Sequence, residues 1–411
     1  MSSSAEDQFA RDPLYGWVVV ISVFVLSAVS FGALASVSVF LKPLSDDFGW
    51  SRATVSFGYS LISFGSAIFG VLWGYLADKY GTRWFGLIAT FIMSGALFLL
   101  SKHSNLTQFY ALYFLFGAFG SSLVGAPLYA NVGFWFRKNP GLAIGLAASG
   151  GAAGQGIVPY ICGRLIETNG WQAAYVYLSF LYLVMALPFA FLIKESPRRN
   201  SARLSRFSEP RDFPISEKEA IIWICFAVIF CCICMSVPIV HLVPLLTDRG
   251  FSMEFATSVL MVAMLVGILG RILGGKLGDM IGALPAYLIM SAGQTILVLW
   301  FPYVQSPIVL YILAACFGFA FSGVMSSILV CARMMVSAKL AGRAISFTSF
   351  FGWFGMGTGG FLGGYFFDLT GDYFLSFQVA CVAGLVNLLI LWQFYRRIYG
   401  KDKSVRIHHN A

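Results

Sequence analysis

Twelve apolar stretches, each long enough to cross a lipid bilayer as one helix, constrain this 411-residue chain more than any other feature. A helix rises about 1.5 Å per residue, so roughly 20 apolar residues span the hydrocarbon core. The apolar runs predict helices over residues 17–41, 53–77, 84–101, 107–136, 141–163, 173–194, 219–246, 254–278, 284–303, 308–336, 342–367 and 373–396. The sequence therefore predicts an all-α membrane protein with twelve transmembrane helices.

Composition excludes a water-soluble globule. Hydrophobic residues make up 58% of the chain and charged residues only 11%, whereas about 25% is usual in soluble domains. The net charge of +9 agrees with basic cytoplasmic loops, which orient membrane proteins. No stretch interleaves Lys or Arg with aromatic residues in a polar setting, so we predict no nucleic-acid partner.

The sequence offers no residues for catalysis or cofactor chemistry. The eight Cys lie in apolar runs without the His spacing of a metal site, so we expect no metal. Glycine-rich runs at 150–156 and 355–360 are not followed by the Lys-Ser/Thr of a phosphate-binding loop. We therefore predict no catalytic residues, no cofactor and no enzyme activity.

One ungapped shift of 201 residues relates the two halves of the chain. Gly74-Tyr-Leu-Ala-Asp78-Lys-Tyr-Gly81 aligns with Gly275-Lys-Leu-Gly-Asp279-Met-Ile-Gly282, and 279 − 78 = 201. The same offset pairs Pro43 with Pro244, Gly49 with Gly250, Gly117 with Gly318, Gly151 with Gly352, Gly154 with Gly355, and Gly163 with Gly364. Six helices per half give both halves the same orientation, as in parallel repeats with a substrate site near the midplane.

The loops predict the domain organisation and the topology. We expect an N-terminal tail (1–16), a six-helix half (17–194), a linker (195–218), a second six-helix half (219–396) and a C-terminal tail (397–411). Five basic residues fall in the outer loops: Lys42, Arg52, Lys102, Arg164 and Arg249. Most of the others lie on the opposite side, so both termini and the linker are predicted to be cytoplasmic, in the cell (inner) membrane. We expect a monomer surrounded by the lipid bilayer.

The loop segment from Gly74 to Arg83 resembles the signature of the major facilitator superfamily between helices 2 and 3. Gly275 to Gly282 is similar to the second, degenerate copy of that signature. The resemblance covers nearly the whole chain. It implies the major facilitator fold and transport by alternating access.

A narrower resemblance is to the monocarboxylate-transporter and oxalate–formate-antiporter branch of that family. Its matching segments are Gly16-Trp17, Ser36 to Phe40, Trp135 to Lys138, Leu142 to Gly145, and Arg271-xxx-Gly275-xxx-Asp279. The resemblance implies that Arg271 binds substrate. The chain departs from animal monocarboxylate carriers at Ala35, where they have Lys, and at Gly267, where they have Asp. It has no Lys in the predicted helix 342–367, where dicarboxylate-binding relatives carry one.

Arg271 is the strongest candidate for substrate binding. It precedes Asp279 by eight residues, or about 12 Å of helix, which places it near the middle of a roughly 30 Å core. A cation there is costly and usually functional, and its guanidinium suits a carboxylate. All eighteen acidic residues lie in loops or at helix ends, so one substrate monoanion would balance this cation. The alternative is a structural Arg bonded to carbonyls.

Five further residues are candidates for the substrate site. His241 could bind substrate, act as a gate or accept a proton, and Asp248 is a second proton candidate; the alternative for His241 is a bond to a backbone carbonyl. Tyr129 and Asn131 could donate to a carboxylate, or serve helix packing. Phe31 and Trp353 could line the cavity, or face lipid or core.

Charged residues at the inner helix ends are candidates for a cytoplasmic gate. They are Asp78, Arg83, Arg137, Asp279 and Arg343. An Asp near a helix N-terminus is favoured by the helix dipole, and a nearby Arg adds charge pairing. The alternative is a simple topology signal.

We predict a secondary active transporter of small monocarboxylates, of the lactate and pyruvate kind or larger organic acids, with proton symport. Within the same class, an anion exchanger or an exporter of another amphipathic solute remains open. A non-transporting membrane sensor is the alternative from a different class.

Overall fold

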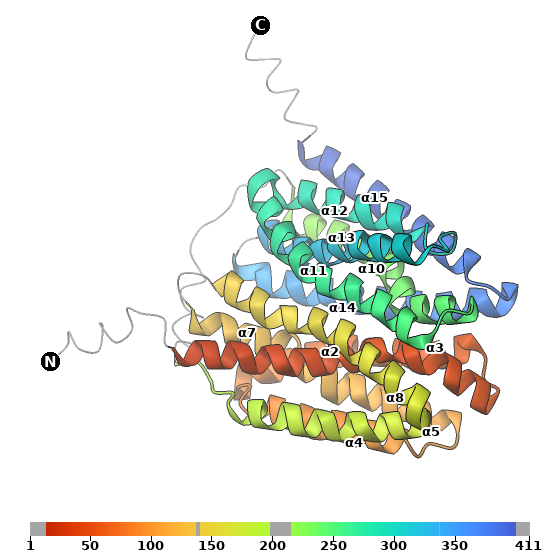
Figure 1. Ribbon diagram of the computed structural model, residues 1–411. Helices are drawn as coiled ribbons and strands as arrows, with labels where there is room; N and C mark the ends of the chain where they lie inside the picture. Colours follow the sequence, from red (N-terminus) through yellow and green to blue (C-terminus); the bar gives the residue numbers. More distant parts are fainter. Residues whose placement is uncertain (1–13, 137–139, 198–214, 337, 400–411) are drawn as a thin grey trace, which may run out of the picture. The chain divides into compact units, whose positions relative to one another are not determined.

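The computed structural model describes residues 14–136, 140–197, 215–336 and 338–399, and within them it contains helices and no strands. The N-terminal tail before residue 14, most of the predicted linker and the C-terminal tail from residue 400 lie outside the described residues. The first half holds α2 (Tyr15–Phe48), α3 (Arg52–Tyr80), α4 (Phe85–Leu100), α5 (Leu106–Leu115), η1 (Phe116–Ser121), α6 (Ser122–Val124), α7 (Ala126–Trp135) and α8 (Pro140–Phe191). The second half holds α10 (Glu217–Asp248), α11 (Met253–Ile281), α12 (Ala283–Val298), α13 (Pro307–Met334), α14 (Ala338–Thr370) and α15 (Phe374–Tyr399) (Figure 1).

These elements form the twelve predicted transmembrane helices. The segments from α5 to α7 make one continuous apolar span, Leu106–Trp135. Helix α8 consists of two helices that meet at Gly170, whose φ of 80° and ψ of 167° break the helical backbone. Within the described residues, eight spans are long and apolar enough to cross a membrane, and α4 and α12 are shorter apolar helices. Helix α14, which carries seven glycines from Gly352 to Gly364, supplies the remaining span.

The first helix is longer than the sequence predicted. We expected it to end at residue 41, because Lys42 and Pro43 are typical of a loop, but α2 continues through Pro43 to Phe48. The ammonium of Lys42 pairs with the carboxylate of Asp248, which stabilises a charge at this helical position. The ends of α2 and α3 therefore extend as helix toward the loop that joins them.

The chain divides into two compact units that are not the two sequence halves. One unit contains residues 1–36 and 64–206, and the other contains residues 37–63 and 207–411. The end of α2 and the start of α3 thus belong to the same unit as α10 to α15. The predicted domain bounds at 17–194 and 219–396 stay a prediction.

The 201-residue repeat is visible in the helix contacts inside each unit. In the first unit, a Cβ at Gly154 of α8 would overlap the carbonyl group of Ala28 in α2. In the second, a Cβ at Gly355 of α14 would overlap the carbonyl group of Ile229 in α10. Since 154 + 201 = 355 and 28 + 201 = 229, the same two positions touch in both units. Small residues let helix backbones approach this closely in a membrane.

The fourth transmembrane helix is interrupted near its middle. Six residues, Phe116–Ser121, form a π-helix, and Gly125 (φ −65°, ψ −113°) then breaks the helix before α7. Two side chains of α3 donate to carbonyl groups of the π-helix: Trp73 Nε1 to Ala118 at 2.8 Å and Ser66 Oγ to Gly117 at 3.3 Å. These donors fix α3 against the interrupted helix.

We predict that Gly154→Ala and Gly355→Ala each lower the apparent melting temperature of the purified protein. The added methyl groups would force backbones apart in both units, and overpacking typically costs about 1–3 kcal/mol. The control is Gly145→Ala on α8, because nothing lies within 4 Å of its Cβ position and Ala favours helix over Gly. Equal melting temperatures for all three variants would refute the packing argument.

Candidate functional site

Arg271 lies on the face of α11 that is turned away from the exposed apolar residues. Its side chain is half-buried. Leu269 and Leu273, which are 57% and 47% exposed, lie about 160° around the helix from Arg271 at 100° per residue. Met264, seven residues earlier and buried, shares the face of Arg271. The guanidinium is therefore carried on the interior side of the helix.

Two glycines beside Arg271 fix the rotation of α11. A Cβ at Gly270 would overlap the carbonyl group of Phe319, and a Cβ at Gly274 would lie 2.7 Å from the Cα of Gly323. Both partners belong to α13, so the two helices pack backbone to backbone. Arg271 cannot turn toward lipid without separating them.

Tyr129 and Asn131 are both held by hydrogen bonds in the first unit. The Tyr129 hydroxyl donates to Ser27 Oγ of α2 at 3.0 Å, and its side chain is half-buried. Asn131 is buried; its Nδ2 donates to the Lys194 carbonyl at 3.0 Å, and its Oδ1 accepts from the Ser196 amide at 3.3 Å. These bonds favour the packing interpretation for Asn131.

Phe31 and Trp353 are half-buried on α2 and α14 respectively. The ring of Phe31 lies against Gly151 of α8, where a Cβ would be 3.1 Å from Cδ2. Neither position distinguishes a cavity wall from helix packing.

His241 is completely buried in α10 and joins that helix to α14. Its Nε2 lies 2.8 Å from the carbonyl oxygen of Gly360, and its ring is 5.3 Å from that of Tyr373. The Nδ1 atom has no hydrogen-bond partner among the described residues. The bond to a carbonyl matches the structural alternative for this residue.

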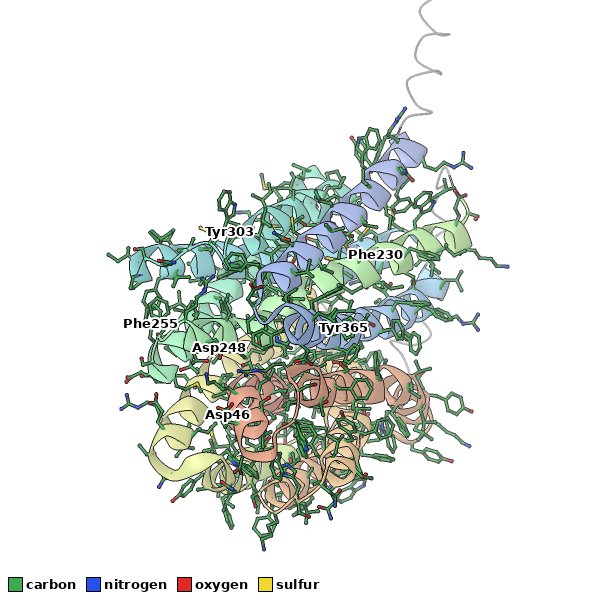
Figure 2. The ribbon with its side chains drawn as sticks, turned by 90° about the vertical axis from the view of Figure 1, so that its right-hand side faces the viewer. Asp46, Phe230, Asp248, Phe255, Tyr303 and Tyr365 are labelled. Atoms are coloured by element: carbon green, nitrogen blue, oxygen red, sulfur yellow. The ribbon has the colours of Figure 1, made fainter. Side chains whose placement is uncertain are left out.

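Asp248 belongs to a cluster of charged residues at the loop ends of α2, α3, α10 and α14 (Figure 2). Asp248 Oδ1 is 2.9 Å from Lys42 Nζ and 3.1 Å from Arg52 Nη2. The guanidinium of Arg52 lies 5.3 Å from the ring centre of Phe367. We call Lys42, Arg52, Asp248 and Asp368 the outer cluster, after the side that the loop charges predict. All four lie in the second unit.

Asp368 caps α3 from another helix. Its Oδ1 accepts from the amide of Arg52 and its Oδ2 from that of Ala53, both at 2.9 Å. Ser51 Oγ accepts from the amide of Thr54. The amides in the first turn of a helix have no partner inside the helix. Here the first three all have an acceptor: the Asp368 carboxylate for two of them and Ser51 Oγ for the third. The helix dipole favours a carboxylate at this end.

Tyr373 adjoins this cluster in the turn between α14 and α15. Its ring lies 4.4 Å from that of Phe367. Burial raises the pKa of the Tyr373 phenol well above its usual range, and the positive charge of Arg52 opposes the shift. Tyr373 therefore stays protonated.

The predicted inner gate is less fully described. Asp78, Arg83 and Arg343 are exposed, and the guanidinium of Arg83 lies 5.3 Å from the ring centre of Trp84. Asp279 is described only by its position on α11, and Arg137 lies outside the described residues. These residues stay a prediction.

Sequence reasoning missed four residues of the outer region. Arg52 and Lys42 were read only as outer-loop charges, and Asp368 was not singled out. Tyr373 carried no signal. One sequence signal could have indicated the outer cluster: acidic and basic residues occur at the same helix ends of an otherwise apolar chain.

Comparisons with known proteins support the fold. A model of the Major Facilitator Superfamily matches residues 23–354. An uncharacterised MFS-type transporter, YcxA of Bacillus subtilis, is 24% identical over 97% of this chain and 99% of its own length. The computed structure is similar to that of the xylose transporter XylE from E. coli, with a TM-score of 0.73 and 15% identity, over 93% of this chain and 98% of that one.

Two relatives with named substrates are also similar. Monocarboxylate transporter 13 of Bos taurus is 27% identical over 93% of this chain and 90% of its own length. Riboflavin transporter RibJ of Trypanosoma cruzi is 30% identical, over only 42% of this chain and 38% of its own length.

Within the described residues no group of His, Cys, Asp and Glu could hold a metal ion.

We predict that Asp368→Ala lowers the free energy of unfolding by about 1–2 kcal/mol, because loss of a helix cap costs that much. The control is Asp46→Ala, which removes an exposed carboxylate from the last turn of α2 (Figure 2). Apparent melting temperatures of the two purified variants test this. Equal values would show that the cap does not stabilise α3.

Proposed function

This chain belongs to the major facilitator superfamily, and on that premise we propose that it transports small organic monocarboxylates. It is a multi-pass membrane transporter and not an enzyme. The proposal for the substrate is supported chiefly by Arg271, a cation on the interior face of α11 near the predicted midplane. A guanidinium binds a carboxylate through two parallel hydrogen bonds.

The charge of the substrate follows from the charges that the chain supplies. The acidic residues lie in loops or at helix ends, and Arg271 is the only Lys or Arg near the middle of a predicted span, because the others inside spans, such as Lys276, Arg333 and Arg343, lie close to helix ends. One monoanion neutralises this cation, whereas a dianion would leave one negative charge uncompensated in a low-dielectric site. We therefore propose monocarboxylates over dicarboxylates.

The similarity to monocarboxylate transporter 13 extends over most of both chains and supports the same class. The similarity to RibJ is restricted to part of the chain, so riboflavin belongs in the first substrate panel. The excess of basic residues on one side supports an inner-membrane protein with both termini in the cytoplasm.

We predict that Arg271→Ala and Arg271→Lys both abolish uptake of pyruvate or lactate by reconstituted liposomes. Lys fails because an ammonium cannot make the two parallel bonds of a guanidinium. The matched control is Lys276→Ala, an exposed cation on the same helix, which should transport normally. All variants should purify as folded protein.

The same liposomes test the substrate class. Unlabelled monocarboxylates should compete with the labelled substrate, and oxalate and malonate should compete much more weakly. Wild-type uptake by Arg271→Ala, or tight binding of dicarboxylates or riboflavin alone, would contradict the proposal.

We further propose that net uptake is coupled to a proton. An inside-negative potential opposes entry of a lone monoanion by about 2.3 kcal/mol per 100 mV, or roughly 50-fold in accumulation. His241 Nδ1 has no hydrogen-bond partner among the described residues, whereas the Asp248 carboxylate is engaged by two cations. His241 is therefore the better proton candidate.

We predict that His241→Gln removes most of the pH dependence of net uptake but leaves substrate exchange intact. The Gln amide can donate to the Gly360 carbonyl as Nε2 does, but it cannot take up a proton as an imidazole can. Liposomes with and without an imposed pH gradient separate the two activities. A wild-type pH profile would transfer the role to Asp248 or to the substrate carboxylate itself.

A further inference from the structure

The carboxylate of Asp248 occupies a site that is built for an anion. Its Oδ1 is 2.9 Å from Lys42 Nζ, and Arg52 Nη2 is 3.1 Å from Oδ1 and 3.3 Å from Oδ2. The cations come from α2 and α3, and the carboxylate comes from α10. Two cations thus face one carboxylate group, which is the arrangement that recognises an organic acid.

Arg52 has binding capacity that Asp248 does not use. Only Nη2 contacts the carboxylate, although a guanidinium can bind with two nitrogens in parallel. Nη1 is buried and has no hydrogen-bond partner among the described residues, and the side chain is 10% exposed. A buried donor without a partner is costly and calls for a ligand.

Asp248 is a poor permanent occupant of this site. It is the last residue of α10, where the helix dipole disfavours a negative charge. Its side chain is 22% exposed and that of Lys42 is 37% exposed, so water reaches the pair. An incoming carboxylate can therefore displace Asp248 from Lys42 and Arg52.

Arg52 has contacts that do not involve Asp248. Asp368 binds the backbone amides of Arg52 and Ala53 and not the guanidinium. The ring of Phe367 lies beside that guanidinium at 5.3 Å. The start of α3 is thus anchored independently of Asp248.

We propose that Lys42 and Arg52 form a second carboxylate site, at the outer end of the transporter, and that Asp248 is its tethered competitor. The site captures an external organic monoanion before that anion reaches Arg271. This inference rests on the proposed function, because the captured ligand is the transported monocarboxylate.

A purely mechanical role for the cluster makes a different prediction. If the ion pairs only latch the outer end shut, neutralising either partner breaks the same latch and has the same effect. If Lys42 and Arg52 bind substrate, removing the competitor strengthens binding and removing the cation weakens it. The signs of the two effects therefore separate the roles.

The test compares Asp248→Asn with Arg52→Gln. Uptake of labelled pyruvate into intact cells gives the KM at the outer face, and inverted vesicles give it at the inner face. We expect Asp248→Asn to lower the outer KM several-fold and Arg52→Gln to raise it roughly tenfold, as a lost charged hydrogen bond should. Both changes should shrink in high salt, which screens exposed charges, and the inner KM should change much less.

Matched controls are Asp46→Asn and Lys102→Gln, an exposed carboxylate and an exposed cation, which should leave both KM values unchanged. If Arg52→Gln does not fold, Lys42→Gln tests the same sign. Shifts of the outer KM in the same direction for both charge-removing variants, or no shift, overturn the second site while leaving monocarboxylate transport intact. Absence of monocarboxylate uptake by the wild type overturns both.

Discussion

Between lipid-facing helices there is no water to drive apolar side chains together, so association depends on how closely the backbones approach. Glycines meet that requirement at equivalent places in both units, at Gly154 against Ala28 and at Gly355 against Ile229. The same contact, made by Gly270 against Phe319, fixes the rotation of α11. The face of α11 that carries Arg271 therefore depends on this backbone packing.

The charges divide into two electrical environments. Near the middle of the spans, a cation is tolerated only with a counter-charge, because the surroundings are poorly polarisable. At the loop ends, Lys42 and Asp248 remain partly exposed, so their pairing is weak enough to exchange. A carboxylate moving inward would thus first meet Lys42 and Arg52 at the loop ends. It would then meet the single cation Arg271, which needs a counter-charge.

Local patterns in the sequence were sufficient for the helices and the repeat. They were not sufficient for contacts between distant residues. The pairing of Lys42 with Asp248 spans 206 residues, and it lets α2 continue where Lys-Pro indicated a loop. Whether Asn131 binds substrate or a carbonyl depends on where Lys194 lies, and no spacing rule gives that position.

The cap on α3 has a consequence for the order of assembly. Asp368 follows Arg52 by 316 residues, so the ribosome must synthesise all of them before that carboxylate exists. Until then, two amides at the start of the second transmembrane helix must be satisfied by water or lipid headgroups. A helix that is synthesised much later therefore completes the start of the second transmembrane helix.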